Sequence, residues 1–222
     1  MTAQLKILVT GFEPFGGELV NPSWEVAKQI EGVQVSGAHV VAVQLPCVFA
    51  TSLTTLNNAL ATHQPQLVLS LGQADGRSDF SIERVAINVC DARIPDNDGV
   101  QPIDEPVVQG GPSAYFSTLP IKKMAESLKR QGFPVGISQT AGTFVCNQVF
   151  YGLQHALAGT SVMSGFVHVP LLPEQAARRP GPSLSSMSTE TLKNALLCVM
   201  EVMVQHFQKG GPDAKLGMGA TH

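Results

Sequence analysis

Charged residues are scarce in this sequence. They make up only 14% of the 222 residues, against roughly 25% in an average soluble domain, whereas hydrophobic residues account for 44%. Low charge combined with a large apolar fraction excludes an intrinsically disordered chain and a highly charged coiled coil. A chain of this length can bury a sizeable core within one α/β domain.

An excess of positive charge is also missing. Lys and Arg number 14 against 17 Asp and Glu, which gives a net charge of −3. Proteins that bind the phosphate backbone of nucleic acids need a basic surface, because release of counterions supplies most of the affinity. We therefore expect no nucleic-acid partner.

Long apolar runs are absent. The richest run, Ala195–Met200, stops at Glu201, far short of the roughly 20 residues that span a bilayer. The apolar stretch within Met1–Leu8 is shorter than the core of a secretory signal. The sequence therefore predicts a cytoplasmic protein without a membrane partner.

Cysteines are few and scattered. Cys47, Cys90, Cys146 and Cys198 form no C-x-x-C pair of the kind that binds zinc or carries out redox chemistry. Disulfides are disfavoured in a protein that is not exported. We expect four thiols and no metal site.

Short apolar runs alternate with segments of helical period. The predicted strands are Leu5–Val9, Val40–Leu45, Gln66–Leu71, Val135–Ser138 and Phe166–Val169. Helices are predicted around Trp24–Ile30, Leu53–Leu60, Ile121–Leu128, Val149–Leu157 and Leu192–Met203. This order predicts one α/β domain over residues 1–209, built on an open, mostly parallel twisted sheet. Residues 210–222 have little to bury and are predicted to be a disordered tail.

Two segments break this rhythm. Within Phe80–Val89 the alternation of apolar residues changes phase at Glu83-Arg84, which predicts a bulge or bend of the kind often found beside active sites. The segment Ile94–Pro120 is a long, turn-rich excursion. Loops of that length in a compact domain are commonly functional or mobile.

Cys146 is a candidate nucleophile. The segment Thr143–Asn147 lies between a predicted strand and a predicted helix, and Thr143 as N-cap would place Cys146 in the first helical turn. Free backbone N–H groups and the helix dipole favour a thiolate there. The alternative is that Cys146 is a small core residue among Phe and Val side chains.

His168 and Glu83 are candidates for the acid and base. If strands 135–138 and 166–169 are parallel neighbours, their carboxyl ends meet, and His168 would lie close to Cys146. Glu83, at the phase change, could orient the imidazole. The alternatives are a satisfied buried histidine and, for Glu83, an ion pair with Arg84 or a surface carboxylate.

The loop Thr10–Gly17 follows the first predicted strand, where α/β proteins often bind phosphate. It lacks both G-x-G-x-x-G and Gly-Lys-Ser/Thr, and it contains Phe12, Glu13 and Phe15. These residues suit a flat, uncharged ligand better than an anion. Alternatively, the two phenylalanines fill the core.

Taken together, several motifs resemble those of the pyroglutamyl peptidase I (pyrrolidone-carboxylate peptidase) family. They are Phe12–Gly17 with Asn21-Pro22-Ser23, Glu83–Asn88, Ala141–Asn147 and His168-Val169-Pro170. The match runs in order from about residue 5 to 208. The resemblance implies an α/β/α sandwich and a cytosolic cysteine peptidase that removes N-terminal pyroglutamate without metal or cofactor. It also implies a homo-oligomer, a dimer or a tetramer.

The resemblance further implies individual roles. Cys146 would be the nucleophile, His168 the general base and acid, and Glu83 the orienting carboxylate. Phe12 and Phe15 would be the walls of the lactam pocket, and the other substrate-binding residues would be Gln73, Asn21 and Arg93. Two alternative functions are another cysteine-dependent amidase on the same scaffold and a non-catalytic phosphate- or nucleotide-binding module.

Overall fold

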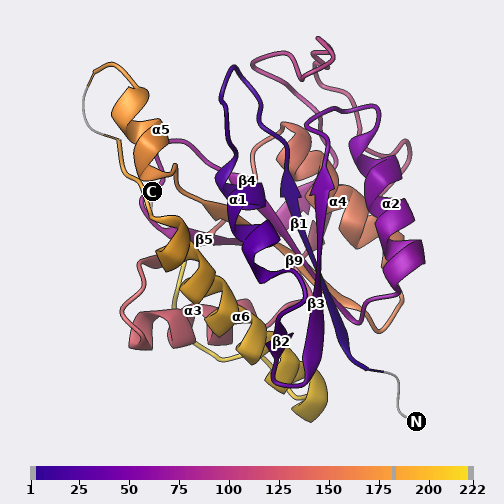
Figure 1. The fold of residues 1–222 in the computed structure, drawn as a ribbon. Helices are drawn as coiled ribbons and strands as arrows, with labels where there is room; N and C mark the ends of the chain where they lie inside the picture. Colours follow the sequence, from indigo (N-terminus) through magenta and orange to yellow (C-terminus); the bar gives the residue numbers. More distant parts are fainter. Residues whose placement is uncertain (1–3, 182–183, 220–222) are drawn as a thin grey trace.

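The computed structural model describes residues 4–181 and 184–219 as three layers, with a seven-stranded sheet between helices (Figure 1). The strand order is β2-β3-β1-β4-β9-β5-β8. The strands are β1 (Lys6–Phe12), β2 (Gln34–Val35), β3 (Ala38–Leu45), β4 (Leu67–Gln73), β5 (Phe80–Glu83), β8 (Val135–Ser138) and β9 (Met163–Val169). The predicted α/β/α sandwich with a mostly parallel open sheet is confirmed.

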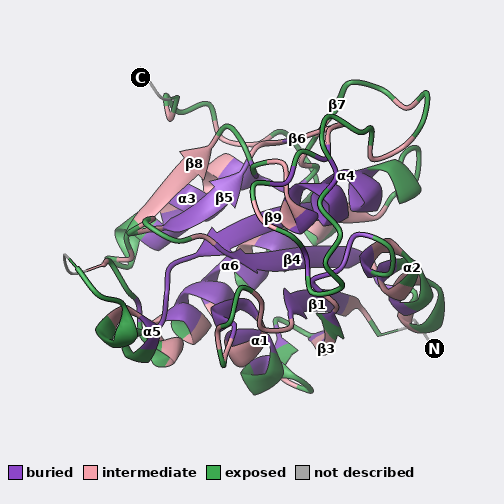
Figure 2. Cartoon of the chain, turned by 90° about the horizontal axis from the view of Figure 1, so that it is seen from above, coloured by how far each residue is buried: buried purple, intermediate pink, exposed green. Residues whose placement is uncertain are grey.

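The centre of the sheet is parallel and its margins are mixed. Strands β3, β1, β4 and β9 run parallel to one another. At the margins, β2 is antiparallel to β3, β5 is antiparallel to β9, and β8 is parallel to β5. Figure 2 shows that the central strands are buried, whereas β8 at the edge is only partly covered. Burial on both faces explains the continuous apolar sequences of the central strands.

Helices cover both faces of the sheet. One core holds residues of α1 (Pro22–Ala27), α3 (Ile121–Arg130) and α6 (Thr189–Lys209), and the other holds residues of α2 (Ser52–His63) and α4 (Val145–Ala156). A short 3-10 helix η1 (Lys28–Ile30) extends α1, and α5 (Pro173–Arg178) follows β9. None of the helices in the described ranges is both long and apolar enough to cross a membrane.

The phase change at Glu83-Arg84 marks a change of sheet. Strand β5 ends at Glu83, and β6 (Val85–Ile87) pairs with β7 (Ala114–Phe116) in a separate two-stranded sheet. The backbone N–H of Arg84 still donates to the carbonyl of Ser138, the last residue of β8, whereas the carbonyl of Arg84 already accepts from the N–H of Ser117 after β7. The predicted bend therefore lies where the chain leaves the main sheet.

The turn-rich excursion is held against two other loops. The buried carboxylate of Asp96 accepts hydrogen bonds from the backbone N–H groups of Phe49 and Val100 at 2.8 Å. Asn97 Nδ2 donates to Glu13 Oε1 and to the carbonyl of Pro14, each at 2.9 Å. These contacts fix the excursion beside the loops that follow β1 and β3, at the edge of the sheet where the candidate site lies.

The segment after α6 has no helix or strand up to Gly219, but it contacts α3. The carboxylate of Asp213 accepts from the backbone N–H groups of Lys122 and Lys123, at 2.9 and 3.0 Å. This carboxylate thereby caps the first turn of α3, because the N-cap residue Pro120 provides no side-chain hydrogen bond. The disorder predicted for residues 210–222 stays a prediction, and residues 220–222 lie outside the described residues.

Candidate active site

The Cys146 thiol lies against the backbone of β4, next to His168. Gly72 of β4 is paired with His168 of β9, so the two positions face the same side of the sheet. A Cβ atom placed on Gly72 would lie 2.9 Å from Cys146 Sγ. A larger residue at position 72 would therefore displace the thiol. The structure thus brings together two of the three predicted catalytic residues.

The route by which they meet differs from the prediction. Strands β8 and β9 are not neighbours, because β5 lies between them and runs antiparallel to β9. The expected parallel pairing of these two strands is wrong. Cys146 reaches His168 because α4 packs across this face of the sheet, where Val149 and Phe150 share a core with Phe166 of β9.

Helix α4 begins one residue later than predicted. Its N-cap is Phe144, which makes no side-chain cap, and Cys146 is in the first turn. The hydroxyl of Thr143, the expected N-cap, instead donates to the carbonyl of Asp91 at 2.6 Å. Because no side chain caps the helix, its first backbone N–H groups are available to an anionic ligand or transition state.

Burial raises the pKa of the Cys146 thiol. The neighbouring Cys47 and the negative charge of Glu83 raise this pKa further, whereas Arg77 and a backbone hydrogen bond lower it. The helix start was expected to favour a thiolate, but removal of the sulfur from water outweighs that effect. A neighbouring base that takes the proton of the thiol during attack would offset this effect.

His168 provides a base whose orientation is fixed. Its Nδ1 lies 2.7 Å from Glu83 Oε1, and both side chains are buried. A proton on Nδ1, donated to the carboxylate, leaves Nε2 able to accept the proton of the thiol. The alternative pairing of Glu83 with Arg84 is not found, because Arg84 Nε donates to Gln139 Oε1 instead.

Arg77 is a charged residue at this site that sequence reasoning missed. Its Nη1 lies 2.7 Å from Glu83 Oε1, and its Nη2 donates to the carbonyl of Thr140 at 3.0 Å. Arg77 lies in the irregular loop between β4 and β5. Because Thr140 is 63 residues away in sequence, no periodicity or motif could have linked the two.

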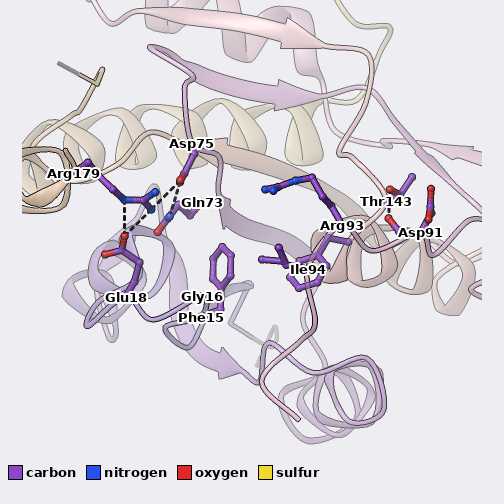
Figure 3. A pocket seen from close by; sticks show the side chains of 11 residues that line it. Phe15, Gly16, Glu18, Gln73, Asp75, Asp91, Arg93, Ile94, Thr143 and Arg179 are labelled. Atoms are coloured by element: carbon purple, nitrogen blue, oxygen red, sulfur yellow. Dashed lines mark hydrogen bonds and ion pairs between the residues drawn. The ribbon is translucent and has the colours of Figure 1, made fainter. Parts of the chain in front are cut away.

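A cavity of about 450 Å³ lies at chain neighbours of these residues, Gln73 after Gly72 and Phe144 before Cys146 (Figure 3). Cys146, His168, Glu83 and Arg77 are not among its lining residues. Its walls come from the loop after β1, the end of β4, the excursion after β6, the start of α4 and the end of α5. The lining residues are Phe15, Gly16, Glu18, Gln73, Asp75, Asp91, Arg93, Ile94, Thr143, Phe144 and Arg179. Of the predicted substrate-binding residues, Phe15, Gln73 and Arg93 line this cavity, and Arg93 points into it (Figure 3).

The aromatic wall differs from the expected pair. Phe15 and Phe144 line the cavity, with ring centroids 6.0 Å apart. Phe12 is only 1% exposed and packs against Phe166 in the core, as the alternative interpretation had it. Sequence reasoning missed Phe144 as a wall, although it lies two positions before Cys146.

Gln73 is held by a chain of polar contacts. Its Nε2 donates to Asp75 Oδ1 at 2.8 Å, and its Oε1 accepts from the buried Gln175 at 3.1 Å. Arg179 then joins Asp75 to Glu18, with N–O distances of 3.0 and 2.6 Å. This chain connects α5, the end of β4 and the loop after β1 on one side of the cavity (Figure 3).

Asn21 lies outside the cavity lining. It is buried and caps α1, where its Oδ1 accepts from the N–H of Ser23 at 3.1 Å. Its Nδ2 donates to the carbonyl of Glu13 at 3.0 Å. Its polar contacts therefore hold the loop that carries Phe15, which places Asn21 behind the cavity wall.

The fold and this site define a class. An α/β/α sandwich with a cysteine in an uncapped first helical turn, beside an imidazole bonded to a buried carboxylate, is the arrangement of a cysteine hydrolase. All four cysteines are free thiols. Within residues 4–181 and 184–219, no three His, Cys, Asp or Glu side chains are grouped so as to hold a metal ion.

Sequence comparisons identify the family. The profile of the pyroglutamyl peptidase family matches residues 5–206, and the chain belongs to this family. A pyrrolidone-carboxylate peptidase of Klebsiella pneumoniae is 55% identical over 217 residues, which cover 97% of this chain and 99% of the relative. One from Yersinia pseudotuberculosis is 53% identical over 93% of this chain and 98% of its own length.

Solved structures agree with this assignment. The crystal structure of pyroglutamyl peptidase I from Bacillus amyloliquefaciens matches with a TM-score of 0.89 and 44% identity, covering 95% of this chain and 100% of that one. Pyrrolidone carboxyl peptidase from Thermococcus litoralis matches with a TM-score of 0.92 and 37% identity, over 96% of this chain and 99% of its own.

Proposed function

We propose that this chain removes N-terminal pyroglutamate from peptides, with Cys146 as the nucleophile, His168 as the general base and acid, and Glu83 as the orienting carboxylate. One observation carries this proposal. The thiol lies against Gly72, the residue in register with His168. Nδ1 of the His168 imidazole is hydrogen-bonded to the buried Glu83 carboxylate. A base held in this way can take the proton of a thiol whose pKa is raised by burial.

The first step forms a thioester. His168 Nε2 takes the proton from Cys146 as the sulfur attacks the carbonyl carbon that follows the lactam ring. The negative charge that develops on the carbonyl oxygen faces the uncapped N–H groups at the start of α4. His168 then gives its proton to the leaving amine, which departs as the amino terminus of the shortened peptide.

The second step hydrolyses the thioester. His168 removes a proton from water, and the resulting hydroxide attacks the thioester carbonyl. The carbon–sulfur bond breaks, the sulfur recovers the proton from His168, and free pyroglutamate leaves. Glu83 keeps the imidazole in one orientation throughout and stabilises its protonated form.

The cavity suits a pyroglutamyl group. This group has neither a free amine nor a charge, so it needs flat apolar walls and a few hydrogen-bonding groups. Phe15 and Phe144 are the proposed walls, and Gln73 is the proposed partner of the lactam. Arg93, which lines the cavity, is the proposed polar residue near the developing oxyanion. Phe12 and Asn21 support these residues from behind.

We also infer a cytoplasmic location and a homo-oligomer, a dimer or a tetramer. Four free thiols suit a reducing compartment. Val100 and Ile103 are 46% and 70% exposed, and apolar side chains on a surface often mark a contact between subunits. Light scattering on the purified protein should give a mass above 23.5 kDa, and a monomer would contradict the oligomer.

Hydrolysis of a chromogenic pyroglutamyl amide tests the proposed function. The wild type should release the chromophore, and Cys146→Ser should lose at least roughly 1,000-fold in kcat. The buried thiols provide matched controls, since Cys47→Ser, Cys90→Ser and Cys198→Ser should remain active. Activity on other amides but not on pyroglutamyl ones would favour a different cysteine amidase. Full activity in Cys146→Ser would reject the nucleophile.

A further inference from the structure

We propose that Arg77 is a positioning residue that ties the Glu83–His168 pair to the loop in front of the nucleophile helix. This inference rests on the proposed function, because it assigns a role within the same reaction. Arg77 touches neither Cys146 nor the residues of the cavity wall through a hydrogen bond among the described residues. Its effect on catalysis therefore has to pass through the residues it holds.

The guanidinium group makes two different contacts. One nitrogen, Nη1, approaches Glu83 Oε1 to 2.7 Å, and the other, Nη2, donates to the carbonyl of Thr140 at 3.0 Å. Glu83 ends β5, whereas Thr140 lies in the loop that leads from β8 into α4. Arg77 therefore joins the base side of the site to the nucleophile side.

The Thr140 loop is shaped so that this contact affects Cys146. Thr140 Oγ1 accepts from the N–H of Gly142, which has a φ of +76° and turns the chain toward α4. A side chain at position 142 would be strained in that conformation. Because only a few residues separate Thr140 from the start of α4, a shift of its carbonyl would be passed on to the helix start.

Glu83 needs a cation. Its side chain is 0% exposed, and Oε1 receives both His168 and Arg77, while Oε2 has no hydrogen-bond partner in the described part of the chain. The titratable or charged groups around it are Arg77 from the β4–β5 loop, His168 from β9 and Cys146 from α4. A buried carboxylate stays ionised only when it is paired.

The loss of Arg77 would change the proton on His168. Without this cation, the buried Glu83 carboxylate would have only His168 as a partner, which favours the neutral carboxyl group. A neutral carboxyl group can donate its proton to Nδ1, which places the imidazole proton on Nε2. In that tautomer Nε2 cannot accept the thiol proton. A purely structural role for Arg77 would not produce this change of protonation.

Arginine suits this position better than lysine. Its planar fork can bind a carboxylate and a carbonyl at the same time through separate nitrogens, whereas an ammonium is a single point charge. The Arg77 side chain is also 27% exposed, so its position is open to solvent. A small guanidinium ion could therefore enter the space that a truncated side chain leaves.

The test compares Arg77→Ala with Arg84→Ala across the pH range. Arg84 is a matched control, because it is a nearby arginine that binds Gln139 and not Glu83. For Arg77→Ala we expect a fall of about 100-fold in kcat and an acid limb of kcat/KM moved to higher pH. The inhibition constant of free pyroglutamate should stay within about twofold of the wild type, which also shows that the variant folds.

Rescue sharpens the test. Guanidinium ion should restore part of the activity of Arg77→Ala and none to Cys146→Ser, and Arg77→Lys should be intermediate between Arg77→Ala and the wild type. An acid limb unchanged from the wild type in Arg77→Ala, or a loss equal to that of Arg84→Ala, would overturn the inference. A wild-type protein that is inactive on pyroglutamyl amides would instead reject the proposed function.

Discussion

The proposed catalytic residues and the cavity walls are built in different ways. Glu83 and His168 are buried on neighbouring strands, and Cys146 lies in the first turn of α4, a helix that packs into the core. The walls lie mostly on loops, and Arg93 and Arg179 are exposed. In the proposed mechanism, regular structure thus positions the catalytic residues, whereas loops form most of the substrate cavity. The two functions should therefore respond separately to substitution.

The forces that hold the two regions also differ. The register of β9 against β4 and β5 is specified by apolar side chains on both faces of the sheet, so a slip by one residue would expose a core. The walls depend on individual polar contacts, such as those of Asn97 with the loop after β1. Such a contact contributes only about 1 kcal/mol, so the walls are the more easily altered region.

The largest expected effect separates turnover from binding. Glu83→Gln should lower kcat by about 10²- to 10⁴-fold, because an uncharged amide neither orients the imidazole as firmly nor stabilises its protonated form. The inhibition constant of free pyroglutamate should not change, since Glu83 does not line the cavity. Steady-state kinetics with pyroglutamate as inhibitor measures both.

The control for this variant is Glu174→Gln, which removes an exposed carboxylate from α5 and should leave both quantities unchanged. Weaker binding of pyroglutamate in Glu83→Gln, with kcat preserved, would show that the buried carboxylate belongs to the substrate site. The separation between the two regions would then be lost.

A smaller effect is expected from the opposite change. Phe15→Ala should lower kcat/KM by roughly 10- to 200-fold, or about 1–3 kcal/mol, because an aromatic wall of the cavity is removed. Cys146 should still react with iodoacetamide at nearly the wild-type rate, since its surroundings are unchanged. Phe116→Ala, which truncates a phenylalanine that is 68% exposed, is the matched control.

Phe12 sharpens the same comparison. Because it is buried against Phe166, Phe12→Ala should lower the free energy of unfolding by about 3–5 kcal/mol, whereas Phe15→Ala should lower it much less. Chemical denaturation measures this difference. If Phe15→Ala binds pyroglutamate as the wild type does, Phe15 is not a wall of the substrate site.

The sequence was most informative where side chains repeat or stand out. The strands β1, β3, β4 and β9 were predicted from their apolar runs, and the phase change at Glu83 located the end of β5. Cys146 and His168 stood out because a cysteine before an apolar helix and a histidine within an apolar strand are unusual. The resemblance to a family then gave these residues their roles.

The remaining features depend on contacts between distant parts of the chain. Strand β5 lies between β8 and β9, which were expected to be neighbours, and no local sequence pattern encodes this strand order. Arg77 lies in an irregular loop, and its carbonyl partner is 63 residues away. Phe12 and Phe15 are the same residue type three positions apart, yet Phe12 ends β1 and lies in the core, whereas Phe15 lies in the following loop and lines the cavity.

Site-resolved alkylation tests the central claim most directly. The enzyme is treated with iodoacetamide for increasing times, and residual hydrolysis of a pyroglutamyl amide is compared with the labelled fraction of each cysteine-containing peptide. We predict that activity falls in proportion to the labelling of Cys146, and that free pyroglutamate slows both. Complete labelling of Cys146 with hydrolysis retained would contradict its role as the nucleophile.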